Sequence, residues 1–552
     1  MKRTHRALAG WLGLALCAVL RAAHAQEAPS KAPEAPTDAQ SLVELRNTVV
    51  NLLEGLVQRG ILTRQDAQAM VADAQRKAEA ETAATRAQQD AEQGAVRVTY
   101  VPDVVKDEIE AAVREDVQGA VVEDVVARAK TEGWGVPGAL PEWVRNVDVN
   151  GVLRVRGEGD YFGEQNAVNT YLNFNAINDA GGIGLAGPDA LLNTTEDRAR
   201  LRARLRLDLA AHVADHITAR LAFATGSLDD PISMNATLAN YGRRLTFAVQ
   251  DASIEWRAGN KGATREFDFL AGRFANPFLS TSSLWDVDLS FEGLAGRISF
   301  DVFRRHNDGF DPGVFLLLGA FPLEEVQLAA DDKWLYAGQI GVNVPIAERS
   351  YFRLASAYYA FRNIVGLRNA PDSRLTDYTA PALLARGNTL FDIRNDLNPD
   401  TNLFALASDY EIADVVAQLD FGAFGKNRLL FTAEYLENRG YDPLEVEARI
   451  GRAADARVKG HQVEVSIGRD IRQAADWRVF AAYRYLERDA VLDAFTDSDF
   501  GLGGTDSEGF YLGFDLGVTR NTWLTTKWLS SNEIDGPPLS IDVLQVDFNT
   551  RF

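Results

Sequence analysis

The sequence lacks the residues on which several protein classes depend. Its 552 residues include one cysteine, Cys17, which excludes a disulfide scaffold and a Cys-rich zinc site. Basic residues are fewer than acidic ones, with 57 Lys and Arg and 78 Asp and Glu, which gives a formal net charge of −21. This balance argues against a nucleic-acid-binding protein. Beyond the first 25 residues no run of about 18 apolar residues occurs, which excludes a membrane protein built from helices.

The first 25 residues have the layout of a secretory signal peptide. Three basic residues precede an apolar run over 7–20, and Ala23-His24-Ala25 is a small-x-small cleavage site. The apolar run is too short to span a membrane. We expect residues 1–25 to be removed during export, which leaves a chain without cysteine.

Residues 26–146 are expected to form linkers and amphipathic helices. A Pro- and Ala-rich linker over 26–40 precedes a segment over 41–93 in which apolar residues recur at spacings of three and four. This stripe fits either a coiled coil or the core face of a small helical hairpin, and both alternatives stay open. Residues 94–146 hold a further amphipathic helix and a linker. We expect all of these residues to lie in the periplasm.

From Val147 to the C-terminus, apolar and polar residues alternate, as they do in strands with two different faces. Many of these strands are roughly ten residues long, and short and long connections follow each other in turn. Both features are typical of a membrane β-barrel and not of a soluble sandwich. The pattern predicts a mainly β fold, a transmembrane antiparallel barrel over 147–552 with about 16 strands. Counts of 14 or 18 stay open because 291–322 is hard to divide, and one strand is expected to begin near Phe404.

One predicted strand carries a row of arginines that alternate with aliphatic residues. In a membrane barrel these arginines cannot face lipid, where each would cost about 2–4 kcal/mol near the midplane, so we expect them to line the pore. Two interpretations stay open. The row is either a polar wall whose arginines pair with acids on neighbouring strands, or a ladder that passes anionic solutes. The residues expected to line the pore are Arg198, Arg200, Arg202, Arg204, Arg206, Arg154 and Arg156.

The last predicted strand ends in an aromatic residue, as the outer-membrane assembly signal requires. Gln545, Phe548 and Phe552 fit its polar, hydrophobic and terminal aromatic positions, whereas Asp547 and Thr550 depart from it. We therefore expect the barrel assembly machinery to recognise this strand.

Several segments resemble the Gram-negative "putative porin" family. They are LVELRNTVVNLLEGLVQRGILTRQDAQA over 42–69, VTYVPDVVK over 98–106, LPEWV over 140–144, WDVDLSFEGL over 285–294 and DDKWLYAGQIG over 331–341. The resemblance implies an outer-membrane barrel behind a helical periplasmic segment. It implies no particular solute.

No arrangement of residues predicts catalysis, a cofactor or a metal site. The glycines at 182, 184 and 187 have the spacing of a dinucleotide fingerprint, but no strand precedes them. His212 and His216 have no third ligand in register. Acidic clusters in predicted loops favour exposed loops that aid solubility, with bridging of divalent cations to lipopolysaccharide as the alternative. These acids are Asp229, Asp230, Asp331, Asp332, Asp493, Asp497, Asp499 and Asp506.

The sequence thus predicts an outer-membrane porin, and not an enzyme, through which small hydrophilic solutes diffuse passively. An anion preference would follow from a free arginine row. The alternative, from another class, is a structural tether that binds the cell wall or a partner through the N-terminal helices. Expected partners are outer-membrane lipid, lipopolysaccharide, the barrel assembly machinery and small solutes, but no nucleic acid. A homotrimer is one assembly that stays open.

Overall fold

The computed structural model describes residues 146–552, except 260–264, 304–312, 328–329 and 399, together with residues 72, 76 and 77, which are helical. The expected signal peptide over 1–25 and the linker over 26–40 therefore lie outside the described residues. So do the expected helical segments over 41–145, apart from these three positions.

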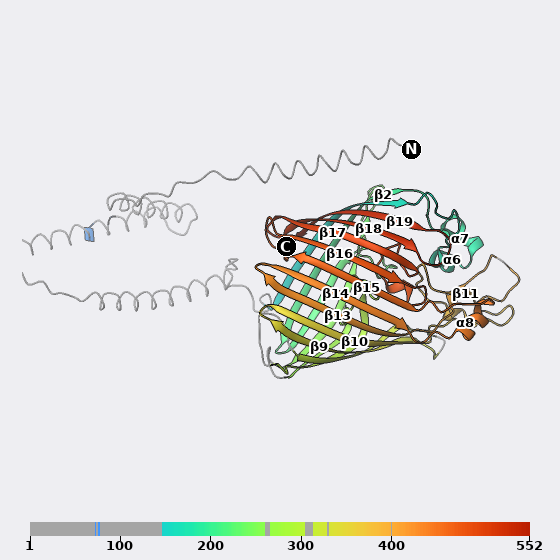
Figure 1. The fold of residues 1–552 in the computed structure, drawn as a ribbon, viewed down its shortest axis with the longest axis horizontal. Coiled ribbons are helices and arrows are strands. Elements are labelled where there is room, and N and C mark those ends of the chain that lie inside the picture. The colour runs from blue at the N-terminus through green and yellow to red at the C-terminus, as the bar shows by residue number, and fades with distance from the viewer. Residues whose placement is uncertain are drawn as a thin grey trace, which may run out of the picture. The chain divides into compact units, whose positions relative to one another are not determined.

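Sixteen long strands close into one antiparallel barrel (Figure 1). Neighbours in the chain pair with each other, and the last strand pairs with the first from Val152↔Arg551 to Phe162↔Ile541. The predicted strand number is confirmed. The strands are β1 (Val147–Phe162), β2 (Arg198–Ala214), β3 (Ile217–Thr225), β5 (Phe247–Ala258), β6 (Arg265–Ala275), β7 (Ser290–Phe300), β8 (Gly313–Glu324), β9 (Lys333–Ala347), β10 (Ser350–Arg362), β13 (Glu411–Phe424), β14 (Asn427–Asn438), β15 (Lys459–Gly468), β16 (Trp477–Leu486), β17 (Ser507–Thr519), β18 (Thr522–Glu533) and β19 (Ser540–Arg551).

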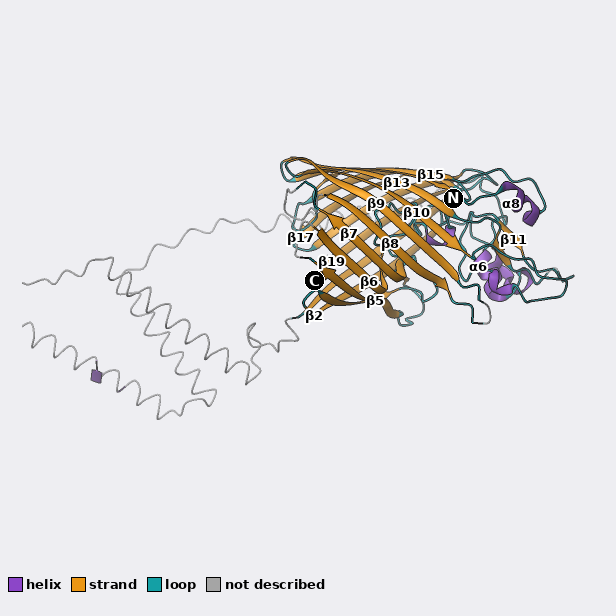
Figure 2. Cartoon of the chain, turned by 90° about the horizontal axis from the view of Figure 1, so that it is seen from below, coloured by secondary structure: helices purple, strands orange, loops and turns teal. Residues whose placement is uncertain are grey.

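Most connections at one end of the barrel are short turns, and most at the other end are longer segments (Figure 2). The connection between β7 and β8 (301–312) is an exception, since it is longer than the connection between β8 and β9 (325–332) at the opposite end. The turn between β17 and β18 has two residues, and Asn521 takes the positive φ of 61° that such tight turns require. The longer segments contain the short elements α6 (Phe174–Ala180), α7 (Ile183–Ala186), η1 (Gly187–Ala190), β4 (Ala236–Thr237), η2 (Asp377–Thr379), α8 (Pro443–Ile450) and η3 (Asp493–Phe495).

One expected strand start is wrong. Residues Phe404–Leu406 form β12, which pairs with β11 (Leu390–Asp392) in a separate two-stranded sheet. The next barrel strand, β13, begins only at Glu411. The reason is a small apolar core around the separate sheet, in which Phe391, Ile393 and Ala405 are buried.

The outer face of the barrel carries apolar side chains, as the period of two requires. Leu201, Ile254, Leu294, Leu318 and Ile340 all have exposed fractions above half. Such a broad exposed apolar surface is typical of proteins that contact lipid or a partner. No helix in the described part of the chain is long and apolar enough to cross a membrane.

The largest buried apolar cluster lies on the opposite, inner face of β7 to β10. Residues 276–289, which connect β6 to β7, pack their aromatic side chains against it. Ring centroids lie 5.0 Å apart for Trp285 and Phe291, 5.4 Å for Trp285 and Tyr359, and 5.2 Å for Phe278 and Tyr359. Edge-to-face aromatic pairs of this kind add to the apolar burial that holds the connection in place.

Candidate functional site: the constriction inside the barrel

The 276–289 segment crosses the interior of the barrel. On one side, Thr281 donates its N–H and its hydroxyl to Glu434 of β14 at 2.8 and 2.6 Å, and Ser283 donates to the same carboxylate. On the other side, Asp288 pairs with Arg204 of β2 at 2.9 Å. Because β14 and β2 are nearly opposite in the ring of strands, the segment spans the space between them.

The 487–506 segment, which connects β16 to β17, also folds inward. Its Asp499 pairs with Arg156 of β1 at 2.9 Å, and its Asp497 lies 3.2 Å from Arg484 of β16. Arg484 is only 1% exposed, so its guanidinium is held by these contacts within the barrel. The segment is thereby tied to β16, from which it starts, and to β1, which lies four strands further along the ring.

The two inward segments contact each other at Asp286. Its backbone N–H donates to the carbonyl of Phe495 at 2.8 Å, and its carboxylate accepts the N–H of Ser498 at 2.9 Å. Burial, followed by the nearby carboxylates of Asp497 and Asp288, raises the pKa of Asp286 to about 8. The junction therefore contains an acid that carries less charge at neutral pH than an ordinary aspartate.

A cavity of about 330 Å³ remains between these segments and the barrel wall. Burial by itself would raise the pKa of Asp499, but the charges of Arg156 and Lys527 outweigh it and hold that pKa below its usual range. Lys527 Nζ lies 4.4 Å from the centroid of the Tyr511 ring, and no carboxylate among the described residues lies within 4 Å of it. The charged residues that line the cavity are Arg154, Arg204 and Lys527, and Asp286, Asp288, Glu464, Asp497 and Asp499.

The arginine row on β2 is extensively paired with carboxylates. Only Arg198, the first residue of the strand, is exposed and has no carboxylate within 4 Å among the described residues. The contacts favour the interpretation of a paired wall, while the role of these residues in lining the pore stays a prediction. The pairs are Arg200 with Glu158 (2.6 Å) and Asp160 (2.9 Å), Arg202 with Glu158 (3.4 Å), Arg204 with Asp288 (2.9 Å), and Arg206 with Asp208 (2.7 Å) and Asp251 (2.6 Å).

The two further arginines, on β1, have partners of the same kind. Arg156 contacts Asp547 of β19 at 2.7 Å as well as Asp499, and Arg154 lies 3.7 Å from Asp547. Arg154 also donates to the side-chain oxygen of Asn235 at 2.6 Å. Arg156 therefore joins β19 to the inward 487–506 segment, whereas Arg154 joins β19 to the connection between β3 and β5.

The acidic partners within the inward segments are not expected from the sequence. The sequence predicts exposed loops around Asp493, Asp497 and Asp506, and this is wrong, since their exposed fractions are 1%, 8% and 2%. The physical reason is that the 487–506 segment folds into the barrel, where its acids meet arginines and backbone N–H groups. A local signal for such folding is absent, because acid-rich loops have the same composition whether they face solvent or a pore.

The expected assembly-signal residues lie on both faces of β19 and at its end. Gln545 is buried and donates to Glu158 at 3.1 Å, whereas Phe548 is 48% exposed on the outer face. Phe552 exchanges backbone hydrogen bonds with Gly151 of β1. Recognition of these residues by an assembly machinery stays a prediction.

His212 contacts Asp148 at 3.1 Å, and the described residues contain no group of three His, Cys, Asp or Glu side chains that could hold a metal ion.

A family model described as "Putative porin" matches residues 46–552. No curated protein sequence matches the chain. Among solved structures the chain is similar to OprB of Pseudomonas putida at high pH, with 14% identity, a TM-score of 0.41, and coverage of 74% of this chain and 95% of that one. It is also similar to the outer membrane channel DcaP of Acinetobacter baumannii, with 14% identity, a TM-score of 0.37, and coverage of 74% and 98%. A loop-deleted OmpT of Vibrio cholerae matches at 10% identity and a TM-score of 0.37, with coverage of 74% and 100%.

Proposed function

The chain belongs to the "putative porin" family, and from this premise we propose that small hydrophilic solutes cross the outer membrane by passive diffusion through its barrel. The observation that carries the proposal is the constriction, in which two segments fold into a closed barrel and leave a charged cavity of about 330 Å³. A barrel of sixteen strands is wide enough to hold an aqueous channel. The family and the fold support a channel rather than an enzyme.

Solutes are selected at the constriction by size and by charge. The cations of this cavity come from β1, β2 and β18, while four of the five acids come from the inward segments. Opposed charges in a narrow space with low-dielectric walls produce a field across the path of the solute. Because the arginines are paired and carboxylates outnumber cations at the lining, we expect no strong anion preference and a weak preference for cations.

Recording in planar bilayers tests this function. The full-length protein, refolded in detergent and shown to migrate differently before and after boiling, should give stepwise currents in potassium chloride. Under a salt gradient its reversal potential should lie near zero or slightly toward the potassium potential. A folded, heat-modifiable barrel that passes no current would contradict the porin function. A reversal potential close to that of chloride would contradict the interpretation that carboxylates pair with the arginines of the wall.

We also propose an orientation for the protein. The end with long segments faces outward, toward lipopolysaccharide, and the end with short turns faces the periplasm together with residues 41–146. Protease added to intact cells should leave these N-terminal residues uncut and should cut them once the outer membrane is permeabilised.

Cross-linking of the full-length protein in membranes tests the homotrimer.

A further inference from the structure

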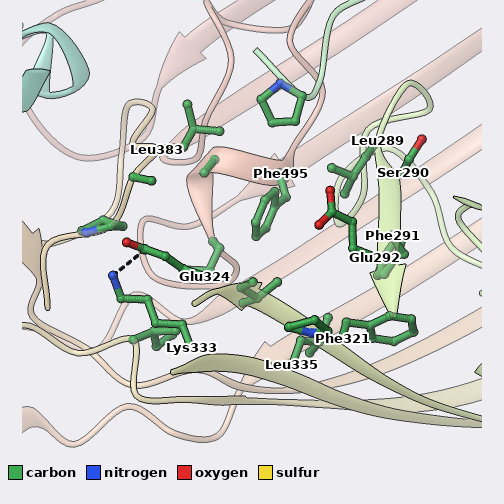
Figure 3. A pocket seen from close by; sticks show the side chains of 18 of the residues that line it. Leu289, Ser290, Phe291, Glu292, Phe321, Glu324, Lys333, Leu335, Leu383 and Phe495 are labelled. Carbon is green, nitrogen blue, oxygen red and sulfur yellow. Dashed lines mark hydrogen bonds and ion pairs between the residues drawn. The ribbon is translucent and has the colours of Figure 1, made fainter. Parts of the chain in front are cut away.

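A second cavity, of about 410 Å³, shares no lining residue with the constriction. Its floor is the aromatic inner wall formed by β7, β8 and β9, and residues 381–384 and 492–495 cover it (Figure 3). Its volume falls within the range of about 300–1,000 Å³ that is typical of small-molecule sites. The cavity is therefore large enough for a compact organic molecule.

The lining is mostly apolar and includes a continuous group of aromatic rings. Trp285 lies 5.0 Å from Phe291 and 5.9 Å from Phe495 between ring centroids, and Phe291 lies 5.0 Å from Phe321. Leu289 and Leu335 complete this wall (Figure 3). Aromatic faces bind apolar rings by burial and attract ammonium groups by the cation–π interaction.

The two cationic side chains at this cavity are already engaged. Lys333 Nζ donates to Glu324 at 2.7 Å (Figure 3). It also donates to the carbonyls of Tyr378 and Ala380 at 3.0 and 2.8 Å, so its three hydrogens are used. Arg273 pairs with Glu292 and donates to the carbonyl of Gln250 at 2.7 Å. Neither side chain is free to bind an anion.

Acidic side chains at the cavity are accessible. The Glu292 side chain is 57% exposed even though it pairs with Arg273. Asp229 is exposed, and no Lys or Arg nitrogen among the described residues lies within 4 Å of its carboxylate. The lining thus joins an apolar aromatic interior to carboxylates that solvent can reach, which complements a cation with an apolar body.

We infer that this cavity binds a small organic ammonium ion, with an aromatic or branched apolar body against Trp285 and Phe495 and the ammonium group beside Glu292 and Asp229. The inference goes beyond the proposed function, which concerns hydrophilic solutes at the constriction. A molecule held here occupies the end of the barrel that bears the long segments. The protein would therefore concentrate such cations at one entrance of the channel.

Calorimetric titration of the full-length protein in detergent tests the inference, with phenethylammonium chloride as the probe. Ethylammonium lacks the ring, and phenylacetate carries the same ring with the opposite charge. We expect saturable binding of phenethylammonium, and binding at least about tenfold weaker for either comparison compound. Equal binding of phenylacetate, or no saturable binding of phenethylammonium, would overturn the inference.

Two variants at exposed positions locate the binding. Ala382→Trp places a large side chain in the cavity and should abolish binding, while Glu292→Lys reverses a charge at the cavity and should weaken binding about tenfold. The matched control is Glu445→Lys, because Glu445 is a similarly exposed glutamate, 61% against 57%, that also pairs with an arginine. This control should bind as the native protein does.

Binding that survives both cavity variants would place the probe in the detergent micelle or elsewhere on the protein, and the inference would be wrong. Heat-modifiable migration verifies that each variant is folded before titration. If the native protein conducts potassium chloride but does not bind the probe, only this inference fails. If it binds the probe but does not conduct, only the proposed porin function fails.

Discussion

The two walls of the barrel interior differ in chemistry although they belong to one sheet. On β1 and β2 the inner face carries arginines paired with carboxylates, as at Arg204 and Asp288. On β8 and β10 the inner face carries Phe321 and Tyr359, whose exposed fractions are 1% and 0%. A wall that faces water must be polar, whereas a wall covered by the 276–289 segment forms a core and gains stability from apolar burial. The inward segment therefore determines which inner wall forms an apolar core and which wall keeps paired polar side chains.

The largest effect is expected where the apolar wall is disrupted. Phe321→Ala removes a ring that contacts Phe274, Phe278 and Phe291, and should lower the free energy of unfolding by about 3–5 kcal/mol. Because the 276–289 segment rests on this wall, single-channel currents should also become noisier. Urea unfolding in detergent measures the first effect. Leu318→Ala, on the outer face of the same strand, is the control and should have a much smaller effect on the currents.

The next effect is expected when a charge is added on the outer face of a strand of the polar wall. Leu205 lies between Arg204 and Arg206 on β2, so its side chain points to the opposite face. Leu205→Arg therefore adds a guanidinium on the lipid face. We expect a cost of about 2–4 kcal/mol near the membrane midplane, and a lower yield of heat-modifiable, inserted barrel. Leu205→Ala should insert normally. Normal insertion of the arginine variant would mean that the faces of β2 are assigned the wrong way round.

A smaller effect is expected from variants that test whether Asp288 neutralises the charge of Arg204. Arg204→Gln should move the reversal potential toward that of potassium, and Asp288→Asn should move it toward that of chloride. Each variant should change the ratio of cation to anion permeability about fivefold, which corresponds to about 1 kcal/mol. The double variant should return close to the native selectivity, because the pair contributes little net charge. If Asp288→Asn alone leaves selectivity unchanged, the pair does not set the charge of the pore.

The smallest effect concerns pH at the junction of the two inward segments. The folded-state pKa of Asp286, about 8, lies above its ordinary value of 3.8. Its neutral form therefore contributes stability that is fully present below pH 3.8 and is lost as the pH rises through 8. Between pH 7 and 8 this loss is on the order of 1 kcal/mol, and the conductance should change over this range. Asp286→Asn should remove the change, and an unaltered pH profile in that variant would exclude Asp286 as its source.

The division of the chain into strands follows from the sequence except near Phe404, where a separate small sheet forms, and it is hardest to make over 291–322, where the inner wall is apolar. In β8 the outward Leu316 and Leu318 alternate with the inward Phe315 and Leu317, so both faces are apolar and the period of two disappears. This explains why 291–322 is hard to divide into strands. A strand buried on both faces gives a continuous apolar run that local patterns cannot resolve.

The period of the sequence by itself determined the barrel, a count of about 16 strands, the face of β2 that carries arginine and the alternation of most short turns with long segments. These features depend on neighbouring residues, because side chains two apart share one face of a strand. The tertiary structure alone decided which arginines are paired and which segments fold inward. Arg156 and Asp547 are separated by 391 residues, and they meet only because β19 closes against β1. A contact of this kind depends on the closure of the whole sheet, so no local pattern in the sequence contains it.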